Sequence, residues 1–293
     1  MELNGVLRGY LELLRPANVV TALADVLAGY AVAGRANSPA LPWLLIATVC
    51  LYAGGVVLND FFDRELYSVE RPERPIPSGR VPARRAAALG TALLAGGVLA
   101  AAQGTPAAAA IAAAIVVLVV LYDARAKRHA LAGPLNMGLC RGLNLLLGVA
   151  AVPAALAGNW PIALISVVYI AGVTTVSRGE VHGGKTGAAA FALISLGGVL
   201  AALTAIGLDA GGRGQILALV LTALLGYRIL PPFWQVYKDP GPLVIRRAVK
   251  AGVLSLVLID AAISAAYAGP LYGAAVLATA LIAGSLARLF SVT

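Results

Sequence analysis

The sequence predicts an all-α, polytopic membrane protein. Of its 293 residues, 60% are hydrophobic and only 12% are charged, and the mean hydropathy is +0.88. A soluble domain carries about 25% charged residues, so a chain this apolar cannot present a polar surface to water, and the bilayer is its expected solvent. The apolar runs do not alternate as the strands of a membrane barrel would, which leaves helices as the spanning elements.

Ten apolar segments divide the chain, and each has roughly the 20 residues that cross a bilayer as a helix. They predict helical spans at 17–34, 42–62, 84–102, 106–122, 138–157, 161–176, 187–206, 214–230, 248–267 and 270–290. The connections between them carry almost all of the charged residues.

The basic residues predict how these spans are oriented. Of the 22 lysines and arginines, only Arg35 and Arg213 fall at one end of the predicted bundle, and all the others fall at the opposite end. Loops rich in lysine and arginine face the cytoplasm, so we expect the charged loops and the N-terminus to be cytoplasmic. This distribution also explains the net charge of +9 without a nucleic-acid partner, and membrane lipid is the expected surrounding.

An unusual polar cluster ends the second span. The run LLIATVCLYAGGVVL leads directly into Asn59, Asp60 and Asp63, whose i, i+1, i+4 spacing brings their side-chain oxygens together on a helix. Hard oxygen ligands suit Mg²⁺, which takes its remaining ligands from water and substrate phosphate, and Arg71 and Arg74 follow as phosphate partners. The alternative is a solvated helix end, but acids at a helix C-terminus oppose the macrodipole.

A second charged loop follows four spans later. The sixth span ends in TTVSRGEVHGGKTG, which places Glu180 between Arg178 and Lys185 in a glycine-rich loop. The fourth and eighth spans also end alike, in VLYDARAK and LLGYRILPPFWQVYK. The arrangement predicts two pseudo-repeated four-helix units of parallel topology, with the two acidic loops facing each other across a cavity.

These motifs resemble the UbiA superfamily of intramembrane prenyltransferases. The resemblance is carried by N-D-x-x-D at Asn59–Asp63, by R-P-x-R-P-I-P-S-G-x-V at Arg71–Val81, and by Arg15-Pro16 before the first span. Tyr122 and Lys127 resemble the family's Y-x-x-x-K element with an offset of one residue. Span order agrees along the whole chain, which implies a single domain over 1–293 with the family's nine-helix bundle plus a tenth C-terminal span. The segment YDARAKRHALAGPLNMGLCRGLNLLLG is similar to the EboC-like subgroup.

The resemblance implies Mg²⁺-dependent transfer of a prenyl group from a polyprenyl diphosphate to an acceptor at the cytoplasmic mouth of a membrane-embedded cavity. It implies that Asp60 and Asp63 are catalytic. The implied metal ligands are Asn59, Asp60, Asp63 and Glu180. The implied diphosphate-binding residues are Arg15, Arg71, Arg74, Lys127, Arg141 and Arg178. The residues expected to contact the acceptor or line the cavity are Asn18, Tyr67, Tyr122, Asp123, Asn136 and Asn144.

The sequence departs from the family's pattern at two places. Tyr67 stands where a further aspartate often follows Asp63, and the second motif has Val176 and Glu180 where the family usually has two acids. One carboxylate is therefore missing. Either a second metal is held more weakly, or Arg178 takes part of its place on the diphosphate.

Several polar residues lie inside apolar runs. Asp25 and Asp260 are intramembrane acids, which mark a functional site or form hydrogen bonds to a serine, threonine or tyrosine of a neighbouring helix. Arg141 enters the fifth span, where it contacts substrate or snorkels to the interface. Asp123 forms an i, i+4 pair with Lys127 or orients the acceptor.

Two other classes of function stay open. The repeated units and the acids within spans are also typical of a secondary transporter, although a transporter places its acids near the bilayer midplane rather than at one mouth. The incomplete second motif leaves room for a non-catalytic protein that binds prenyl lipid. The acceptor, the prenyl chain length and the number of metal ions are not defined by these motifs.

Overall fold

The computed structural model describes residues 2–34 and 37–290, and side chains from residue 5 onward. Its described part is helical without strands, which confirms the predicted all-α class. Ten of the helices have 15 residues or more, as the ten apolar segments predicted. They are α2 (Pro16–Val32), α3 (Leu41–Phe62), α5 (Ala83–Gly104), α6 (Pro106–Ala124), α7 (Ala132–Val149), α9 (Ala163–Ser177), α10 (Thr186–Ala210), α11 (Gly212–Lys238), α12 (Pro242–Ala268) and α13 (Pro270–Leu289).

Eight helical segments among the described residues are long and apolar enough to cross a membrane. The two long helices outside this group are α2, which has 17 residues, and α7, which carries Asn136, Arg141 and Asn144. Both lie inside the bundle and bury most of their residues. Their polar side chains therefore face neighbouring helices instead of lipid.

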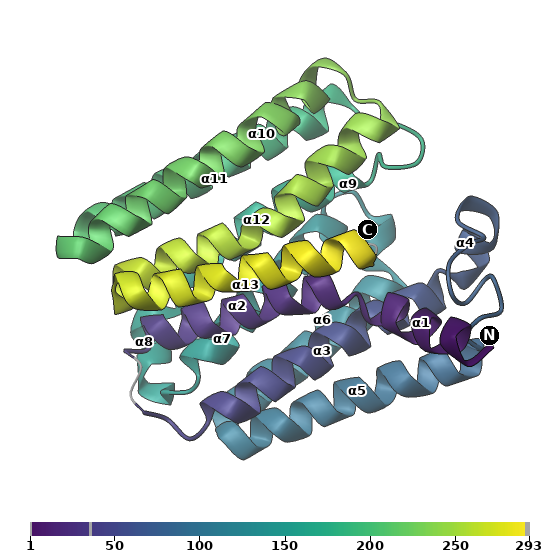
Figure 1. Ribbon diagram of the computed structural model, residues 1–293, viewed down its shortest axis with the longest axis horizontal. Coiled ribbons are helices and arrows are strands. Elements are labelled where there is room, and N and C mark those ends of the chain that lie inside the picture. Colours follow the sequence, from purple (N-terminus) through teal and green to yellow (C-terminus); the bar gives the residue numbers. More distant parts are fainter. Residues whose placement is uncertain (1, 35–36, 291–293) are drawn as a thin grey trace.

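The long helices pack in two groups that follow the chain order (Figure 1). Helix α3 lies along α5 and contacts α2 and α6, whereas α9 contacts α7 and α10, and α10 contacts α11. The groups meet where α2 crosses α7 at Gly29 and Gly148. A Cβ atom there would lie 2.0 or 2.1 Å from a carbonyl oxygen of the opposite helix, so only glycine permits this approach. Helix α12 joins the second group to α2, and α13 packs on α2 and α12.

A short amphipathic helix, α1 (Glu2–Leu14), precedes the first span. Its outer face exposes Val6, Leu7 and Leu11, and Leu7 is 60% exposed. Nearer the end of the helix, Leu13 is buried in a small cluster with Val57. The apolar segments of the sequence did not predict this helix, whose one-sided apolar pattern is typical of a helix that lies in the membrane interface.

The two largest differences from the predicted span boundaries are at the ends of the fifth and eighth spans, and prolines are involved in both. Helix α7 ends at Val149, short of the predicted end at 157. The chain continues through the short helices η2 (Pro153–Ala155), α8 (Leu156–Asn159) and η3 (Trp160–Ile162), because Pro153 and Pro161 interrupt regular hydrogen bonding. Helix α11 instead continues past its internal proline pair to Lys238. Burial of Phe233 and Val236 in the core offsets the missing backbone bonds.

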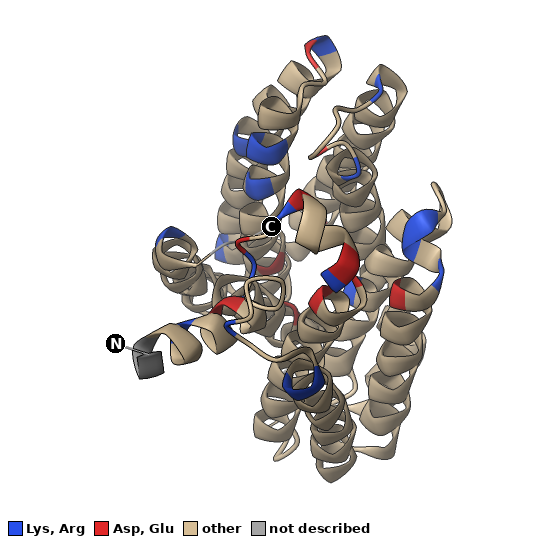
Figure 2. Cartoon of the chain, turned by 90° about the vertical axis from the view of Figure 1, so that its right-hand side faces the viewer, with Lys and Arg blue, Asp and Glu red and all other residues tan. Residues whose placement is uncertain are grey.

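The charged residues gather at one end of the bundle, the end that faces the viewer in Figure 2. This end holds both termini and the short helix α4 (Arg64–Glu70) with the loop that follows it (Figure 1). Arg213 lies at the start of α11, near the opposite end, and Arg35 lies outside the described residues. The predicted segregation of charge is therefore present in the fold, and its assignment to the cytoplasmic face stays a prediction.

Candidate functional site

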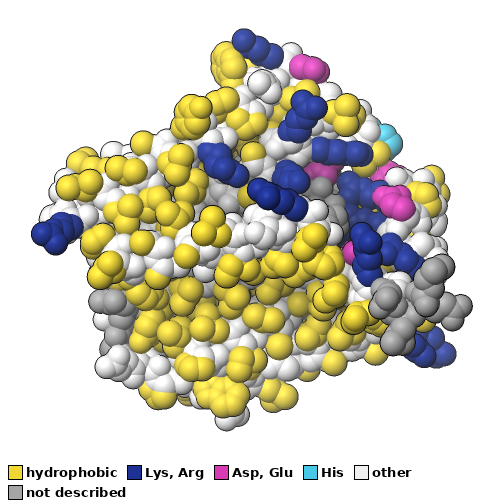
Figure 3. Space-filling view, viewed as in Figure 1, with side chains coloured by type: hydrophobic (Ala, Val, Ile, Leu, Met, Phe, Trp, Pro, Cys, Tyr) yellow, Lys and Arg dark blue, Asp and Glu magenta, His cyan; other side chains and the backbone are white. Residues whose placement is uncertain are grey.

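A cavity of about 410 Å³ lies between α2, α3, α6, α7, α9 and α12. Its inner walls are apolar and include Ile115, Val173 and Leu256, whereas arginines and acids line it at the charged end. On the face shown in Figure 3, hydrophobic side chains cover most of the surface and charged ones gather near that end. Most of the predicted site residues line this cavity, namely Arg15, Asn18, Asn59, Tyr67, Arg71, Arg74, Tyr122, Asp123, Arg141, Asn144, Arg178 and Glu180.

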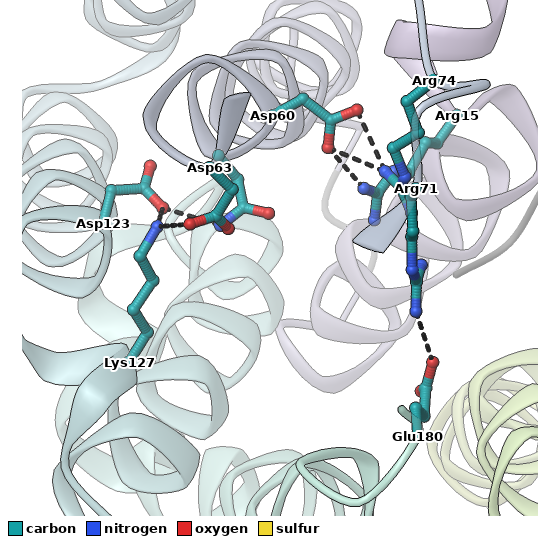
Figure 4. Close-up of polar contacts among 9 residues, drawn as sticks. Arg15, Asp60, Asp63, Arg71, Arg74, Asp123, Lys127 and Glu180 are labelled. Carbon is teal, nitrogen blue, oxygen red and sulfur yellow. Dashed lines mark hydrogen bonds and ion pairs between the residues drawn. The ribbon is translucent and has the colours of Figure 1, made fainter. Parts of the chain in front are cut away.

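Asp60 is held by two arginines from different segments (Figure 4). Its Oδ1 accepts a hydrogen bond of 2.6 Å from Nη2 of Arg15, and Nη1 of Arg74 donates to both carboxylate oxygens at 3.0 Å. The Asp60 side chain is only 4% exposed. Arg15 has a φ of 46°, the single described non-glycine residue with a positive value. Strain of this kind concentrates at functional sites, and here it precedes Pro16, the first residue of α2.

A second polar group surrounds Asp63 and Lys127. Nζ of Lys127 donates to Oδ1 of Asp63 at 2.5 Å and lies 3.8 Å from Oδ1 of Asp123, so the predicted i, i+4 pair is present. Nδ2 of Asn59 donates to Oδ1 of Asp123 at 2.8 Å. This bond turns the amide nitrogen of Asn59 toward α6 and leaves its oxygen as the group available to a ligand. Oδ2 of Asp123 is buried without a hydrogen-bond partner.

Glu180 lies across the cavity, in the loop that follows α9. Nη2 of Arg71 donates to its carboxylate at 3.3 Å, and Nε of Arg246 donates to its backbone carbonyl at 3.0 Å. Gly183 has a φ of +86°, a conformation that glycine adopts without a steric penalty. Burial raises the pKa of the Glu180 carboxyl, and the positive charge of Arg71 opposes that shift.

The other charged residues of this loop bind protein groups. Nη1 of Arg178 donates to the carbonyl of Lys127 at 2.7 Å and to that of His129 at 3.3 Å. Arg178 therefore holds the loop that carries Lys127, in addition to lining the cavity. The ring of His182 lies 3.3 Å from a carboxylate oxygen of Glu70. Val176, where the family usually has an acid, is 2% exposed within the hydrophobic core.

Tyr67 occupies the position where a third acid often follows Asp63 in the family. The guanidinium of Arg74 lies 4.5 Å from the centre of its ring, and that of Arg71 lies 5.9 Å away. An aromatic face attracts a guanidinium at such distances. Burial raises the pKa of the Tyr67 phenol, so this residue positions two arginines at neutral pH without adding a negative charge.

The intramembrane polar residues form a buried network between helices. Nε of Arg141 lies 2.6 Å from Oδ2 of Asp25, and Nδ2 of Asn144 donates to the same oxygen at 2.8 Å. Thr48 donates to Asn144 at 2.6 Å, which ties α3 to α2 and α7. The partners of Asp25 are thus an arginine and an asparagine and not the serine, threonine or tyrosine considered from the sequence; Asp260 lies next to it. Replacing Arg141 or Asp25 by a neutral residue would leave the other as a buried charge without its ion-pair partner.

Four of the predicted site residues do not line the cavity. They are Asp60, Asp63, Lys127 and Asn136. The first three form the ion pairs at its mouth, whereas Asn136 accepts a weak hydrogen bond from Cys140 of its own helix. Tyr52 also lines the cavity, and the guanidinium of Arg141 lies 5.8 Å from the centre of its ring. This residue was not predicted from the sequence. Its position seven residues before Asn59, two helical turns earlier, is the signal that places it on the same face.

The donor atoms at the mouth suit Mg²⁺, since Asn59, Asp60, Asp63 and Glu180 supply hard oxygen ligands. Within the described part of the chain, however, no three acidic, histidine or cysteine side chains are grouped as a metal site. The carboxylates of Asp60, Asp63 and Glu180 each lie against a basic side chain instead. The oxygen donors therefore suit Mg²⁺. In this structure, however, each of the three carboxylates is neutralised by a basic side chain.

The model of the UbiA prenyltransferase family matches residues 22–242, a range that includes both acidic motifs and most of the cavity wall. The chain belongs to the UbiA prenyltransferase family. This confirms the superfamily indicated by Asn59–Val81, while the EboC-like subgroup stays a prediction.

Relatives within this family carry one recurrent name. The digeranylgeranylglyceryl phosphate synthase of Ignicoccus hospitalis is 39% identical over 149 residues, which cover 50% of this chain and 48% of that protein. The enzyme of the same name from Methanothrix thermoacetophila is 34% identical over 60% of this chain and 68% of its own length. The match to the Ignicoccus protein thus spans about half of that relative's length.

Solved structures share the fold. A digeranylgeranylglyceryl phosphate synthase superposes with a TM-score of 0.65 and 22% identity, over 88% of this chain and 97% of its own. A UbiA homologue from Archaeoglobus fulgidus bound to GPP and Mg²⁺ superposes with a TM-score of 0.58 and 16% identity, over 92% of this chain and 99% of its own. These likenesses confirm the UbiA-type bundle. Family membership and the apolar helices identify an integral, multi-pass membrane protein.

Proposed function

We propose that this chain transfers a prenyl group from a polyprenyl diphosphate to an acceptor in its membrane-embedded cavity, with Mg²⁺ as cofactor. The observation that carries the proposal is the placement of Asp60, Asp63 and Glu180 among basic side chains at the mouth of an apolar cavity. Carboxylates suit a divalent cation, arginines suit a diphosphate, and an apolar wall suits an isoprenoid. Family membership and the relatives named as prenyl-lipid synthases support it.

The residues of the chain take distinct parts in this reaction. Asn59, Asp60, Asp63 and Glu180 would hold the metal, which when bound helps to neutralise the departing diphosphate. Arg15, Arg71, Arg74 and Lys127 bind the diphosphate oxygens. The bond between C1 of the prenyl group and its oxygen breaks, the electron pair leaves with the diphosphate, and the acceptor forms a new bond to C1. Apolar side chains such as Val173 and Leu256 exclude water, which would otherwise capture the allylic cation.

We further propose that the acceptor is a lipid of the glyceryl phosphate type, as the names of the two relatives suggest. Such an acceptor would attack C1 through a hydroxyl oxygen, and the hydroxyl proton would be released. The arginines at the mouth, including Arg178 on the exposed side, supply charge complementary to its phosphate.

The test of this function uses purified protein in lipid with Mg²⁺, geranylgeranyl diphosphate and geranylgeranylglyceryl phosphate. We expect mass spectrometry to show a doubly prenylated glyceryl phosphate, and Asp63→Ala to abolish its formation. Folded protein that neither binds nor consumes any prenyl diphosphate with Mg²⁺ would contradict the proposal. Binding without turnover across many acceptors would instead indicate a non-catalytic lipid-binding protein.

We also propose that the charged end of the bundle faces the cytoplasm, because it carries nearly all of the lysines and arginines. The test is the labelling of single cysteines by a membrane-impermeant reagent in intact cells. A cysteine replacing Ser78, in the loop after α4, should be protected until the cells are opened. A cysteine replacing Gln215, near the start of α11, should be labelled at once, and the reverse result would contradict the orientation.

A further inference from the structure

The proposed metal ligands and the proposed diphosphate ligands are paired with one another. Each of the three carboxylates at the cavity mouth contacts at least one of the four cations there, at nitrogen–oxygen distances between 2.5 and 3.3 Å. The pairs are Asp60 with Arg15 and Arg74, Asp63 with Lys127, and Glu180 with Arg71. Two groups that are expected to bind different ligands therefore neutralise each other.

These side chains are poorly solvated, so water is a weak substitute for a lost partner. The seven side chains are between 4% and 18% exposed. An ion that loses its partner in such surroundings is destabilised far more than it would be on an open surface. Binding of a metal alone would leave the cations without partners, and binding of a diphosphate alone would leave the carboxylates without partners. Both are accordingly unfavourable.

The charge balance shows what relieves this cost. The three carboxylates, the carboxylate of Asp123 that lies 3.8 Å from Nζ of Lys127, and the four cations sum to a formal charge of zero. One divalent ion by itself would raise that charge to +2, and a prenyl diphosphate of about −3 by itself would change it to −3. The two together leave a charge of only −1 and offer the paired side chains new partners of opposite charge.

We propose that the ion pairs at the cavity mouth exchange partners on binding, so that the site accepts metal and diphosphate as a pair and resists either one alone. The carboxylates pass from the cations to the metal while the cations pass to the diphosphate. The inference rests on the proposed function and adds to it that Lys127 and Arg71 suppress metal binding until the diphosphate arrives.

This role has a consequence that simple phosphate ligands do not share. Replacing Lys127 by methionine frees Asp63, and so it should tighten the binding of metal in the absence of diphosphate. A lysine that only contacts phosphate would alter diphosphate binding alone, apart from a general effect of removing one positive charge. Arg64→Met measures that general effect, because Arg64 follows Asp63 directly but pairs with the exposed Glu65.

In the experiment, Mn²⁺, a paramagnetic substitute for Mg²⁺, is titrated into the purified protein in lipid. Electron paramagnetic resonance measures the concentration of free Mn²⁺. Titrations are run with and without geranyl S-thiolodiphosphate, an unreactive donor analogue. In the natural protein the analogue should tighten metal binding by about 10- to 100-fold, a typical size for coupling between sites. Lys127→Met should tighten metal-only binding by about fivefold relative to Arg64→Met and reduce the coupling by a similar factor.

Further variants separate the possible results. The gain should vanish in Lys127→Met combined with Asp63→Asn and Asp123→Asn, because both carboxylates that Lys127 contacts are then neutral. Arg71→Met, which frees Glu180, tests the same idea in the second loop and serves if the lysine variant does not fold. Metal-only affinities of Lys127→Met and Arg71→Met that equal that of Arg64→Met would overturn the inference while leaving the proposed function standing. Absence of metal binding even with the analogue would overturn both.

Discussion

The end of α3 and the residue that caps it present Asn59, Asp60 and Asp63 to the cavity mouth, whereas the loop after α9 presents only Glu180. In the first motif, Arg15, Arg74 and Lys127 donate to Asp60 and Asp63, and Asp123 accepts a hydrogen bond from Asn59. In the second motif, Arg178 donates to backbone carbonyls and His182 contacts Glu70, so neither side chain is directed at the cavity alone. Each acidic motif follows a long apolar helix, but the two motifs are unequal in what they offer to a ligand.

This inequality indicates a division of labour. The first motif carries most of the ligands expected for the metal, while the second closes the site by holding the loops around it. Arg178 binds the carbonyls of the segment that carries Lys127, and Glu180 binds Arg71 of the loop after α4. The missing acid at Val176 is consistent with this division, because that position faces the hydrophobic core.

The largest difference between the motifs should appear on neutralising one carboxylate in each. Asp60→Asn should lower kcat by about 10³-fold, the effect of losing a principal group that stabilises the leaving charge. Glu180→Gln should lower it by about 10- to 100-fold, as expected for a supporting interaction. The measurement is product formation by mass spectrometry at saturating Mg²⁺, with Glu65→Gln as an exposed control. Equal losses in the two variants would refute the division of labour.

Restoring an acid in the second motif should damage the fold and leave activity no higher. Val176→Asp places a carboxylate in the apolar core, which costs about 3 kcal/mol or more when no partner is present. A thermal unfolding assay in detergent measures the loss, and Val176→Thr, of nearly the same shape, serves as the matched control. A stable Val176→Asp protein with improved Mg²⁺ affinity would show that this position reaches the metal.

Removing the clamp from the second loop should have an intermediate effect. Arg178→Met releases the carbonyls of Lys127 and His129, so it should lower kcat/KM by about 10- to 100-fold. Arg178→Lys should recover little of this, because a lysine lacks the planar fork that reaches two carbonyls. Arg125→Met removes an exposed arginine from the connection between α6 and α7, which also carries Lys127, and should change kcat/KM less than twofold. The comparison is made on steady-state rates across donor concentrations.

The smallest effect is expected at the rim of the second loop. The ring of His182 contacts Glu70, but its side chain is 81% exposed, and exposed pairs contribute little. His182→Gln should therefore change kcat/KM less than twofold, as should Glu70→Gln. A loss of tenfold or more, measured in the same rate assay, would mean that the second loop contributes a functional group besides Glu180.

Much of the fold was predictable because lipid leaves the backbone few choices. A segment that crosses a bilayer must satisfy its own hydrogen bonds, so the apolar runs predicted the long helices and their number. The boundaries at Val149 and Lys238 were not predictable, because they depend on whether packing offsets the hydrogen bonds that prolines remove. The acidic cluster at the end of α3 was predictable from its spacing, since three residues within two turns of a helix share one end in any fold.

The partners of the polar residues came from the tertiary structure alone. Nothing in the sequence joins Arg141 to Asp25, Arg178 to the carbonyl of Lys127, or Arg71 to Glu180, because each contact joins segments that are far apart along the chain. Sequence by itself determined which residues carry charge, where the apolar runs interrupt them, and at which end of the bundle they gather. Only the packed helices decided which charges form ion pairs, because ion pairing depends on distance and burial, and both are properties of the assembled bundle.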